Sequence, residues 1–208
     1  MNRLLHIDAS IFQTPSVTRQ LTADIVRKLL AKYPAAQATY RDVVAEEIRP
    51  LNAAIAAGFR AGNDDNVSEY IAEQHRLSDL LVAEFLASDV IVIGAPMYNF
   101  SVPAQLKSWL DRIAQAGKTF SYTAQGPVGL SGGRTVIVAS ARGGFYHGGS
   151  LEEWDFQERY LAAFFRFLGV EHIHVIRAEG ASKGEAIQQR EIGNAFNAAS
   201  TLIQSLAL

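Results

Sequence analysis

The sequence predicts an α/β protein in which helices cover both faces of a doubly wound sheet of five parallel strands. Segments typical of strands and of helices alternate along the whole chain. The runs 90–95 and 135–140 are almost continuously apolar and rich in β-branched residues. Such runs are typical of strands buried on both faces of a parallel sheet, whereas a strand with one wet face alternates apolar and polar residues.

The first part of the chain contains two of the predicted strands. Leu21, Ile25 and Leu29 recur at helical spacing, and Pro34 follows that helix as a stop signal. In order, the patterns favour a strand at 4–8, a helix ending at 32, a strand at 38–43, an ambiguous stretch at 44–66 with a short helix and a loop, and a long helix at 67–87.

The third strand, 90–95, leads into a polar-aromatic turn and a helix. Pro96 cannot donate to a strand ladder and is expected to end the strand. Ser101 is expected to cap the following helix, with Pro103 in its first turn, where the missing N–H matters little. Lys107 and Asp111 are spaced for an i, i+4 ion pair. The inner face of this helix is expected to consist of Leu106, Leu110 and Ile113.

The last part of the chain completes the predicted sheet. It favours, in order, a small hairpin within 119–133, a strand at 135–140, a Gly-rich loop at 141–150, a helix at 156–168, a strand at 172–177 and a helix at 187–206. No repeat, low-complexity tract or linker interrupts this order. A single domain over residues 1–208 is therefore expected.

The composition excludes several classes of protein. A net charge of −2 without a basic cluster argues against nucleic-acid binding. The absence of cysteine excludes disulfides, thiolate metal sites and a cysteine nucleophile, and no metal is expected. No apolar stretch is long enough for a transmembrane helix or a signal peptide. A cytoplasmic protein that does not bind membranes is therefore expected.

Three loops should meet at the carboxyl edge of the sheet, where open α/β sheets bind ligands. The loop after the first strand offers the hydroxyls of Ser10, Ser16 and Thr18 just before a helix. A helix N-terminus with such donors can hold a phosphate, although Ser16 acting only as a helix cap is about as good an interpretation. The loop has neither the GxxxxGK[ST] nor the GxGxxG pattern.

The other two loops are aromatic and Gly-rich. Met97, Tyr98, Asn99 and Phe100 follow the third strand and suit a flat, partly polar ligand. The loop at 140–149 combines glycines, whose backbone amides can approach a ligand closely, with Phe145, Tyr146 and His147. Alone it would favour a flexible surface loop, but the three loops together predict a mononucleotide site.

These motifs resemble the FMN-dependent NADH:quinone oxidoreductases, also called azoreductases. The resemblance rests on the segment 97–103, on Leu106-Lys107 with Trp109 and Asp111, on Ser16-Val17-Thr18 and on Arg142-Gly143-Gly144. It implies a flavodoxin-like fold with strand order 2-1-3-4-5 and a homodimer with FMN at the interface. The cofactor-binding residues that it implies are Ser10, Ser16, Val17, Thr18, Pro96, Met97, Tyr98, Asn99, Phe100, Ser140, Ala141, Arg142, Gly143 and Gly144.

Further positions concern one contact to the flavin, a proton donor and the pocket for the electron acceptor. Family members commonly have Ser at the position of Ala141, so a hydroxyl contact is either missing here or supplied by Ser140. His147 is a candidate proton donor, with an exposed loop histidine of no chemical role as the alternative. The pocket for the acceptor is expected to include Phe145 and Tyr146, together with Phe59, Phe120 and Tyr122 from across the dimer, although core packing explains these last three about as well.

The resemblance implies a ping-pong reaction in which NADH gives a hydride to FMN, which then reduces a quinone or an azo compound. Besides a redox-regulated interaction module, which would bind flavin without meaningful turnover, two alternatives stay open. One is an NADPH-dependent FMN or nitroaromatic reductase on the same fold. The other is a flavodoxin-type electron carrier, against which the small net charge argues, because such carriers are usually strongly acidic.

Overall fold

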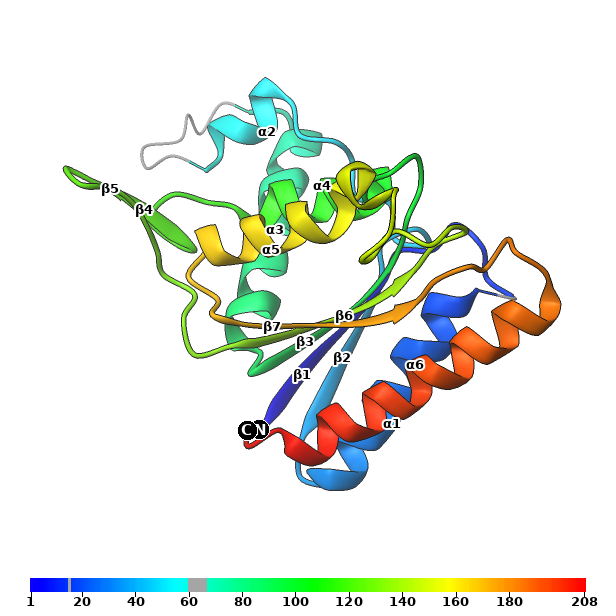
Figure 1. Cartoon of the computed structure of the whole chain (residues 1–208). Helices are drawn as coiled ribbons and strands as arrows, with labels where there is room; N and C mark the ends of the chain where they lie inside the picture. Colours follow the sequence, from blue (N-terminus) through cyan, green and yellow to red (C-terminus); the bar gives the residue numbers. More distant parts are fainter. Residues whose placement is uncertain (15, 60–66) are drawn as a thin grey trace.

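Five parallel strands form the central sheet of the computed structural model, which describes residues 1–14, 16–59 and 67–208. Their order across the sheet is β2-β1-β3-β6-β7 (Figure 1). This order agrees with the expected 2-1-3-4-5 when β4 and β5 are left out, since these two form a separate two-stranded sheet. The strands of the sheet are β1 (Arg3–Asp8), β2 (Gln37–Asp42), β3 (Val90–Pro96), β6 (Thr135–Ala141) and β7 (His172–Ala178).

Helices lie on the two sides of this sheet (Figure 1). Helices α1 and α6 lie on one side, with α3, α4 and α5 on the other. Each side buries its own hydrophobic cluster, one with Leu21 and Ile25 of α1 and the other with Trp109 of α4. The helices are α1 (Val17–Lys32), α2 (Ala53–Ala57), α3 (Glu69–Ala87), α4 (Ala104–Ile113), α5 (Phe156–Phe167) and α6 (Glu185–Ser205), with a 3₁₀ turn at Glu152–Trp154.

The two central strands are the most completely apolar ones because both of their faces are covered. Every residue of β3 and of β6 is buried. The edge strand β2 exposes its first four residues, which matches its more polar sequence. The strands and long helices predicted from the sequence are confirmed, with ends that shift by up to two residues.

The start of α4 differs from the expectation. Pro103, not Ser101, is the N-cap residue, and no side chain caps this helix. Ser101 instead exchanges two backbone hydrogen bonds with Tyr98, N to O at 3.0 and 3.1 Å, which closes a tight turn. The expected pair of Lys107 and Asp111 is confirmed at 2.5 Å, as is the burial of Leu106, Leu110 and Ile113.

The hairpin predicted after α4 is confirmed as β4 (Phe120–Thr123) and β5 (Gly126–Gly129). Figure 1 shows it projecting from the left of the molecule, whereas β6 and β7 end at the right. In the described part of the chain, none of the helices is long and apolar enough to cross a membrane. The ambiguous stretch contains α2, and its residues 60–66 lie outside the described residues.

Candidate functional site at the carboxyl edge of the sheet

A cavity of about 320 Å³ lies at the carboxyl edge of the sheet. It is bounded by the three predicted loops and by a fourth segment, the one that joins β7 to α6. Ten of the predicted cofactor-binding residues line it: Ser10, Ser16, Val17, Thr18, Pro96, Met97, Tyr98, Ala141, Arg142 and Gly143. The other lining residues are Phe12, Ala181, Ser182 and Gln188, which the sequence reasoning missed.

One end of the cavity is the N-terminus of α1. Ser16 caps this helix, its Oγ accepting a hydrogen bond from the Arg19 N–H at 3.4 Å. The cap is therefore confirmed, and a further role of Ser16 in binding phosphate stays a prediction. The same Oγ lies 3.2 Å from Thr18 Oγ1, and both residues line the cavity. The first N–H groups of a helix have no partner within the helix and carry partial positive charge. This end therefore offers an anion both backbone and hydroxyl donors.

The aromatic loop forms a strained turn beside that end. Asn99 and Phe100 have φ values of 48° and 70°, a left-handed conformation that is unusual for phenylalanine. The turn places Tyr98 with its hydroxyl 3.3 Å from the Ile11 N–H and 3.5 Å from Ser10 Oγ. Asn99 and Phe100 themselves are not among the residues that line the cavity. Strain of this kind costs about 1–3 kcal/mol per residue and clusters at functional sites.

The Gly-rich loop is tied to the segment after β7 by backbone hydrogen bonds. The carbonyl oxygens of Arg142, Gly143 and Gly144 accept from Ala181, Ser182 and Gly180 at 3.0–3.2 Å. Because C=O and N–H point in opposite directions in a trans peptide, the N–H groups of Gly143 and Gly144 point away from that segment. A Cβ on Gly143 would lie 2.7 Å from Ser182 Oγ, so a larger residue here would require the Ser182 side chain to move.

The side chain of Arg142 points away from the cavity into a buried polar cluster. It forms ion pairs with Asp155 and Glu158 and lies 3.7 Å from a Glu179 oxygen. It also donates to Ser140 Oγ at 2.7 Å, and this hydroxyl donates to Gln157 at 2.9 Å. Ser140 therefore does not replace the hydroxyl missing at residue 141, because neighbouring strand residues point to opposite faces. Arg142 reaches the cavity with its main chain.

Glu179 extends the cluster to the aromatic part of the loop. Its Oε1 accepts hydrogen bonds from the N–H groups of Tyr146 and His147, at 2.9 and 3.1 Å. The Tyr146 ring lies edge-on to Phe100, with centroids 6.5 Å apart, and Phe100 packs in the same way on Trp154 at 5.4 Å. These rings give the site a partly exposed aromatic rim.

The predicted acceptor residues are not all brought together within one chain. Phe145 and Tyr146 lie in the loop after β6, but Phe120 and Tyr122 lie on the projecting hairpin, away from the ends of β6 and β7 (Figure 1). Phe120 is buried against Tyr122 and Phe167, whereas Tyr122 is 73% exposed. Phe59 follows α2 and does not line the cavity. A single chain therefore does not wall its own cavity with these three rings.

His147 also lies outside the cavity. It lines a separate cavity of about 560 Å³ together with four acidic residues and Arg159. Its side chain faces solvent, which fits the alternative of an exposed loop histidine. The sequence signal that could have found Ala181 and Ser182 was their position just after the fifth strand, at the same edge as the other loops.

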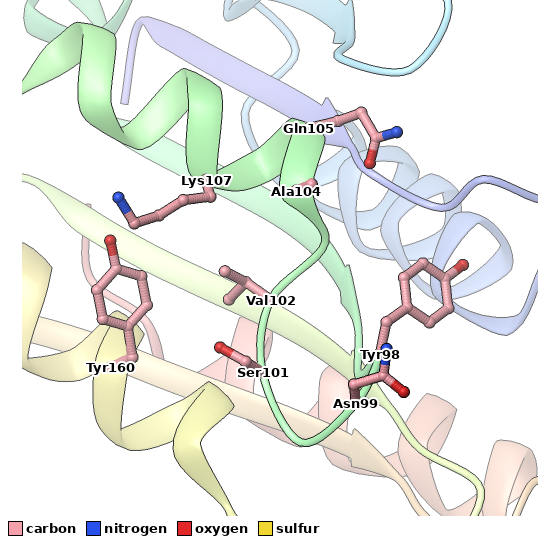
Figure 2. Close-up of a pocket in the computed structure, with 8 residues that line it drawn as sticks. All are labelled: Tyr98, Asn99, Ser101, Val102, Ala104, Gln105, Lys107 and Tyr160. Atoms are coloured by element: carbon pink, nitrogen blue, oxygen red, sulfur yellow. The ribbon is translucent and has the colours of Figure 1, made fainter. Parts of the chain in front are cut away.

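A further cavity of about 540 Å³ lies beside the start of α4 (Figure 2). Figure 2 shows Lys107 of α4 and Tyr160 of α5 facing each other near Val102, while the ring of Tyr98 points away from Tyr160. Burial and the nearby Asp111 raise the pKa of Tyr160 to about 12, so its hydroxyl stays protonated at neutral pH. None of the hydroxyls at the N-terminus of α1 lines this cavity.

The 320 Å³ cavity fits a phosphorylated aromatic ligand. Its anion-binding end at α1 and its aromatic turn at Tyr98 are joined by Met97, and small residues at 141 and 143 leave room for a flat ring. The volume lies within the range of about 300–1,000 Å³ that is typical of small-molecule sites. The donor set therefore matches the phosphate and ring of a flavin mononucleotide.

Fold and site define a parallel, doubly wound α/β protein that has its ligand cavity at the carboxyl edge of the sheet. A family model described as "Flavodoxin-like fold" matches residues 2–202. The chain belongs to this family.

Relatives of known name agree with this assignment. The chain is 57% identical over 182 residues to FMN-dependent NADH:quinone oxidoreductase 2 of Xanthomonas euvesicatoria pv. vesicatoria (strain 85-10), covering 88% of this chain and 84% of that protein. It is 53% identical to an FMN-dependent NADH:quinone oxidoreductase of Ralstonia nicotianae (strain ATCC BAA-1114 / GMI1000), covering 88% of each chain.

Solved structures are similar over almost the whole chain. An azoreductase from Bacillus anthracis str. Sterne superposes with a TM-score of 0.90 at 26% identity, covering 99% of this chain and 100% of that one. An FMN-dependent NADH-azoreductase from Bacillus anthracis str. Ames Ancestor, in complex with FMN, superposes with a TM-score of 0.84 at 25% identity. That match covers 98% of this chain and 100% of that one.

Proposed function

We propose that this protein is an FMN-dependent NADH:quinone oxidoreductase that also reduces azo compounds. The observation that carries the proposal is the cavity at the carboxyl edge, which joins the N-terminus of α1 to the aromatic turn and the Gly-rich loop. The names of the relatives at 53–57% identity support the reaction and the donor NADH.

The N-terminus of α1 would hold the phosphate of FMN. The donors available there are the backbone N–H groups of Val17 and Thr18 and the hydroxyls of Ser10, Ser16 and Thr18, all of which belong to residues that line the cavity. No lysine or arginine lines this cavity with a free charge among the described residues, since the Arg142 guanidinium is buried in its own ion pairs. Helix N-terminus and hydroxyls together therefore carry the recognition of the phosphate.

The ring system of FMN would be held between the aromatic turn and the Gly-rich loop. Met97, Tyr98, Asn99 and Phe100 would line the ribityl chain and one side of the isoalloxazine. The main chain of 141–144 would hold its pyrimidine end, where the N–H groups of Gly143 and Gly144 would stabilise negative charge. Ala141 contributes no hydroxyl there.

When bound, FMN would supply the redox chemistry of the reaction, a two-electron transfer from NADH to the acceptor. The protein's own part is to orient the ring and to exclude water from it. The exposed rim of Phe100, Phe145, Tyr146 and Trp154 gives flat acceptors a surface on which to stack.

Two copies of the chain form the working enzyme in this proposal. Exposed aromatic residues surround the site, with Phe12 61% and Trp154 53% exposed, and such patches mark interaction surfaces. Tyr122 is 73% exposed on a projecting hairpin. We place Phe59 and Tyr122 of one copy at the acceptor pocket of the other, with the buried Phe120 ring supporting Tyr122 from behind.

Steady-state kinetics test the function. The FMN-loaded protein is assayed with NADH and with NADPH, against a benzoquinone and against an azo dye. We expect two-electron turnover of both acceptors and a higher kcat/KM with NADH. Equal kcat/KM with NADPH contradicts the stated donor, and bound flavin that NADH does not reduce indicates an electron carrier instead.

A further inference from the structure

A partly buried arginine holds the loop that follows β1. Arg19, in the first turn of α1, has a side chain that is only 12% exposed. Its Nε donates to the Phe12 carbonyl at 3.1 Å and its Nη2 donates to the Ser10 carbonyl at 2.9 Å. Both Ser10 and Phe12 line the 320 Å³ cavity, so one guanidinium fixes two carbonyl groups of the cavity wall.

The guanidinium is in turn anchored to the rigid sheet. Asp8 and Asp42 are the last residues of β1 and β2 and lie opposite each other in the sheet. Arg19 Nη1 lies 2.8 Å from Asp42 Oδ2 and 3.5 Å from Asp8 Oδ2. The Arg19 side chain therefore connects the loop to the ends of two neighbouring strands of the sheet.

Further contacts fix the two carboxylates. Asp8 accepts hydrogen bonds from Thr22 Oγ1 at 2.8 Å and from the Tyr40 hydroxyl at 3.1 Å. Burial and the charge of Asp8 raise the pKa of Tyr40 to about 12, so Tyr40 remains a donor at neutral pH. Burial disfavours the charge of Asp42, but hydrogen bonds from Arg19 and from two backbone N–H groups outweigh it and lower the pKa of Asp42.

Arg19 thus faces two carboxylates, and its hydrogen bonds go to the protein's own oxygens. It is poorly suited to attract an anion by charge, but its planar fork is well suited to fix geometry. We infer that Arg19 is a positioning residue: it holds the Ser10–Phe12 loop in the shape that binds the phosphate of the ligand. This inference rests on the proposed FMN site.

In this role the geometry of the Arg19 guanidinium matters, and its positive charge alone is not sufficient. Lysine at position 19 would keep the charge, but its single ammonium group lacks the fork that reaches two carbonyl groups and a carboxylate at once. Both Arg19→Lys and Arg19→Met should therefore loosen the loop. Asp42→Asn leaves the loop contacts in place and weakens only the anchor, so its effect should have the same direction and a smaller size.

Flavin titration of the apoprotein tests the inference, with FMN and riboflavin as probes that differ only in the phosphate. The ratio of the two dissociation constants measures how well the phosphate is bound. Quenching of flavin fluorescence gives each constant for wild type and for the three variants. Arg27→Met is the matched control, because Arg27 lies on the same helix with a side chain that is 70% exposed and pairs only with Asp24 in the described structure.

We expect Arg19→Met and Arg19→Lys to lower the preference for FMN over riboflavin by about 10- to 100-fold, with riboflavin affinity almost unchanged and the control like wild type. A preference that survives in Arg19→Lys overturns the positioning role in favour of simple charge. Equal losses for both flavins, or none, also overturn it. A wild type with no preference for FMN instead refutes the proposed phosphate site. Circular dichroism identifies a variant that has lost its fold, and the milder Asp42→Asn then decides.

Discussion

Replacing Arg142 with methionine removes the positive centre of the buried cluster behind the cavity. The Arg142 side chain is fully buried and faces the carboxylates of Asp155, Glu158 and Glu179. Methionine is similar in length but uncharged, so the variant leaves these carboxylates facing one another. Removing one partner of a buried ion pair typically costs about 3–5 kcal/mol of folding free energy.

The structure places the expected loss at the lower end of that range. Arg177 still pairs with Glu158 at 2.7 Å, and Asp155 still accepts from two N–H groups at the start of α5. The carboxylates also retain 10–12% of their exposure to water. We therefore expect a loss of about 3 kcal/mol, or about 6–12 °C in Tm for a chain of this size.

Urea unfolding of the apoprotein at neutral pH, followed by circular dichroism, measures this loss. Arg142→Lys keeps the charge and should recover part of the stability. Arg190→Met is the control, because Arg190 is 62% exposed and its pair with Glu191 is worth about 1 kcal/mol or less. A loss below about 1 kcal/mol for Arg142→Met would refute the view that the cluster supports the Gly-rich loop.

Three further substitutions test other contacts. Gly94→Ala places a Cβ 2.8 Å from Asp8 Oδ1, so we expect a loss of about 1–3 kcal/mol; an unchanged Tm contradicts the close packing. Phe100→Gly relieves a positive φ but removes an aromatic ring, so stability should stay within about 1 kcal/mol while KM for quinones rises; an unchanged KM removes Phe100 from the acceptor surface. The third substitution is Asp89→Asn. In the wild type, the backbone N–H of Asn2 in particular holds the pKa of the Asp89 carboxyl below its ordinary value. The ionised Asp89 therefore stabilises the fold fully above about pH 4, and this stabilisation disappears as the pH falls further. We expect the free energy of unfolding of the variant to depend less on pH in acid, and a pH dependence equal to that of wild type refutes this.

The sheet was predictable because hydrophobic burial determines it. The central runs at 90–95 and 135–140 are apolar since both faces are covered, and the structure buries every residue of β3 and β6. The start of α4 was less predictable. Ser101 is a good capping residue in isolation, but the backbone pairing of Tyr98 with Ser101 uses it in the turn.

The candidate site was predictable to the level of loops rather than of side-chain directions. Parallel strands bring their following loops to one edge, and this geometry alone gathers Ser16, Tyr98 and Gly143. Whether Arg142 faces the cavity or the interior depends on partners in α5 that no local pattern links to it. The same holds for Arg19, whose anchors come from the ends of two strands.

A crystal structure of the protein with FMN tests the central claim most directly. We predict the phosphate at the N-terminus of α1, within hydrogen-bond distance of Ser16 and Thr18, and the ring between Tyr98 and Gly143. Electron density for FMN in the cavity beside Lys107 and Tyr160, or at any place other than the carboxyl edge, would contradict the account.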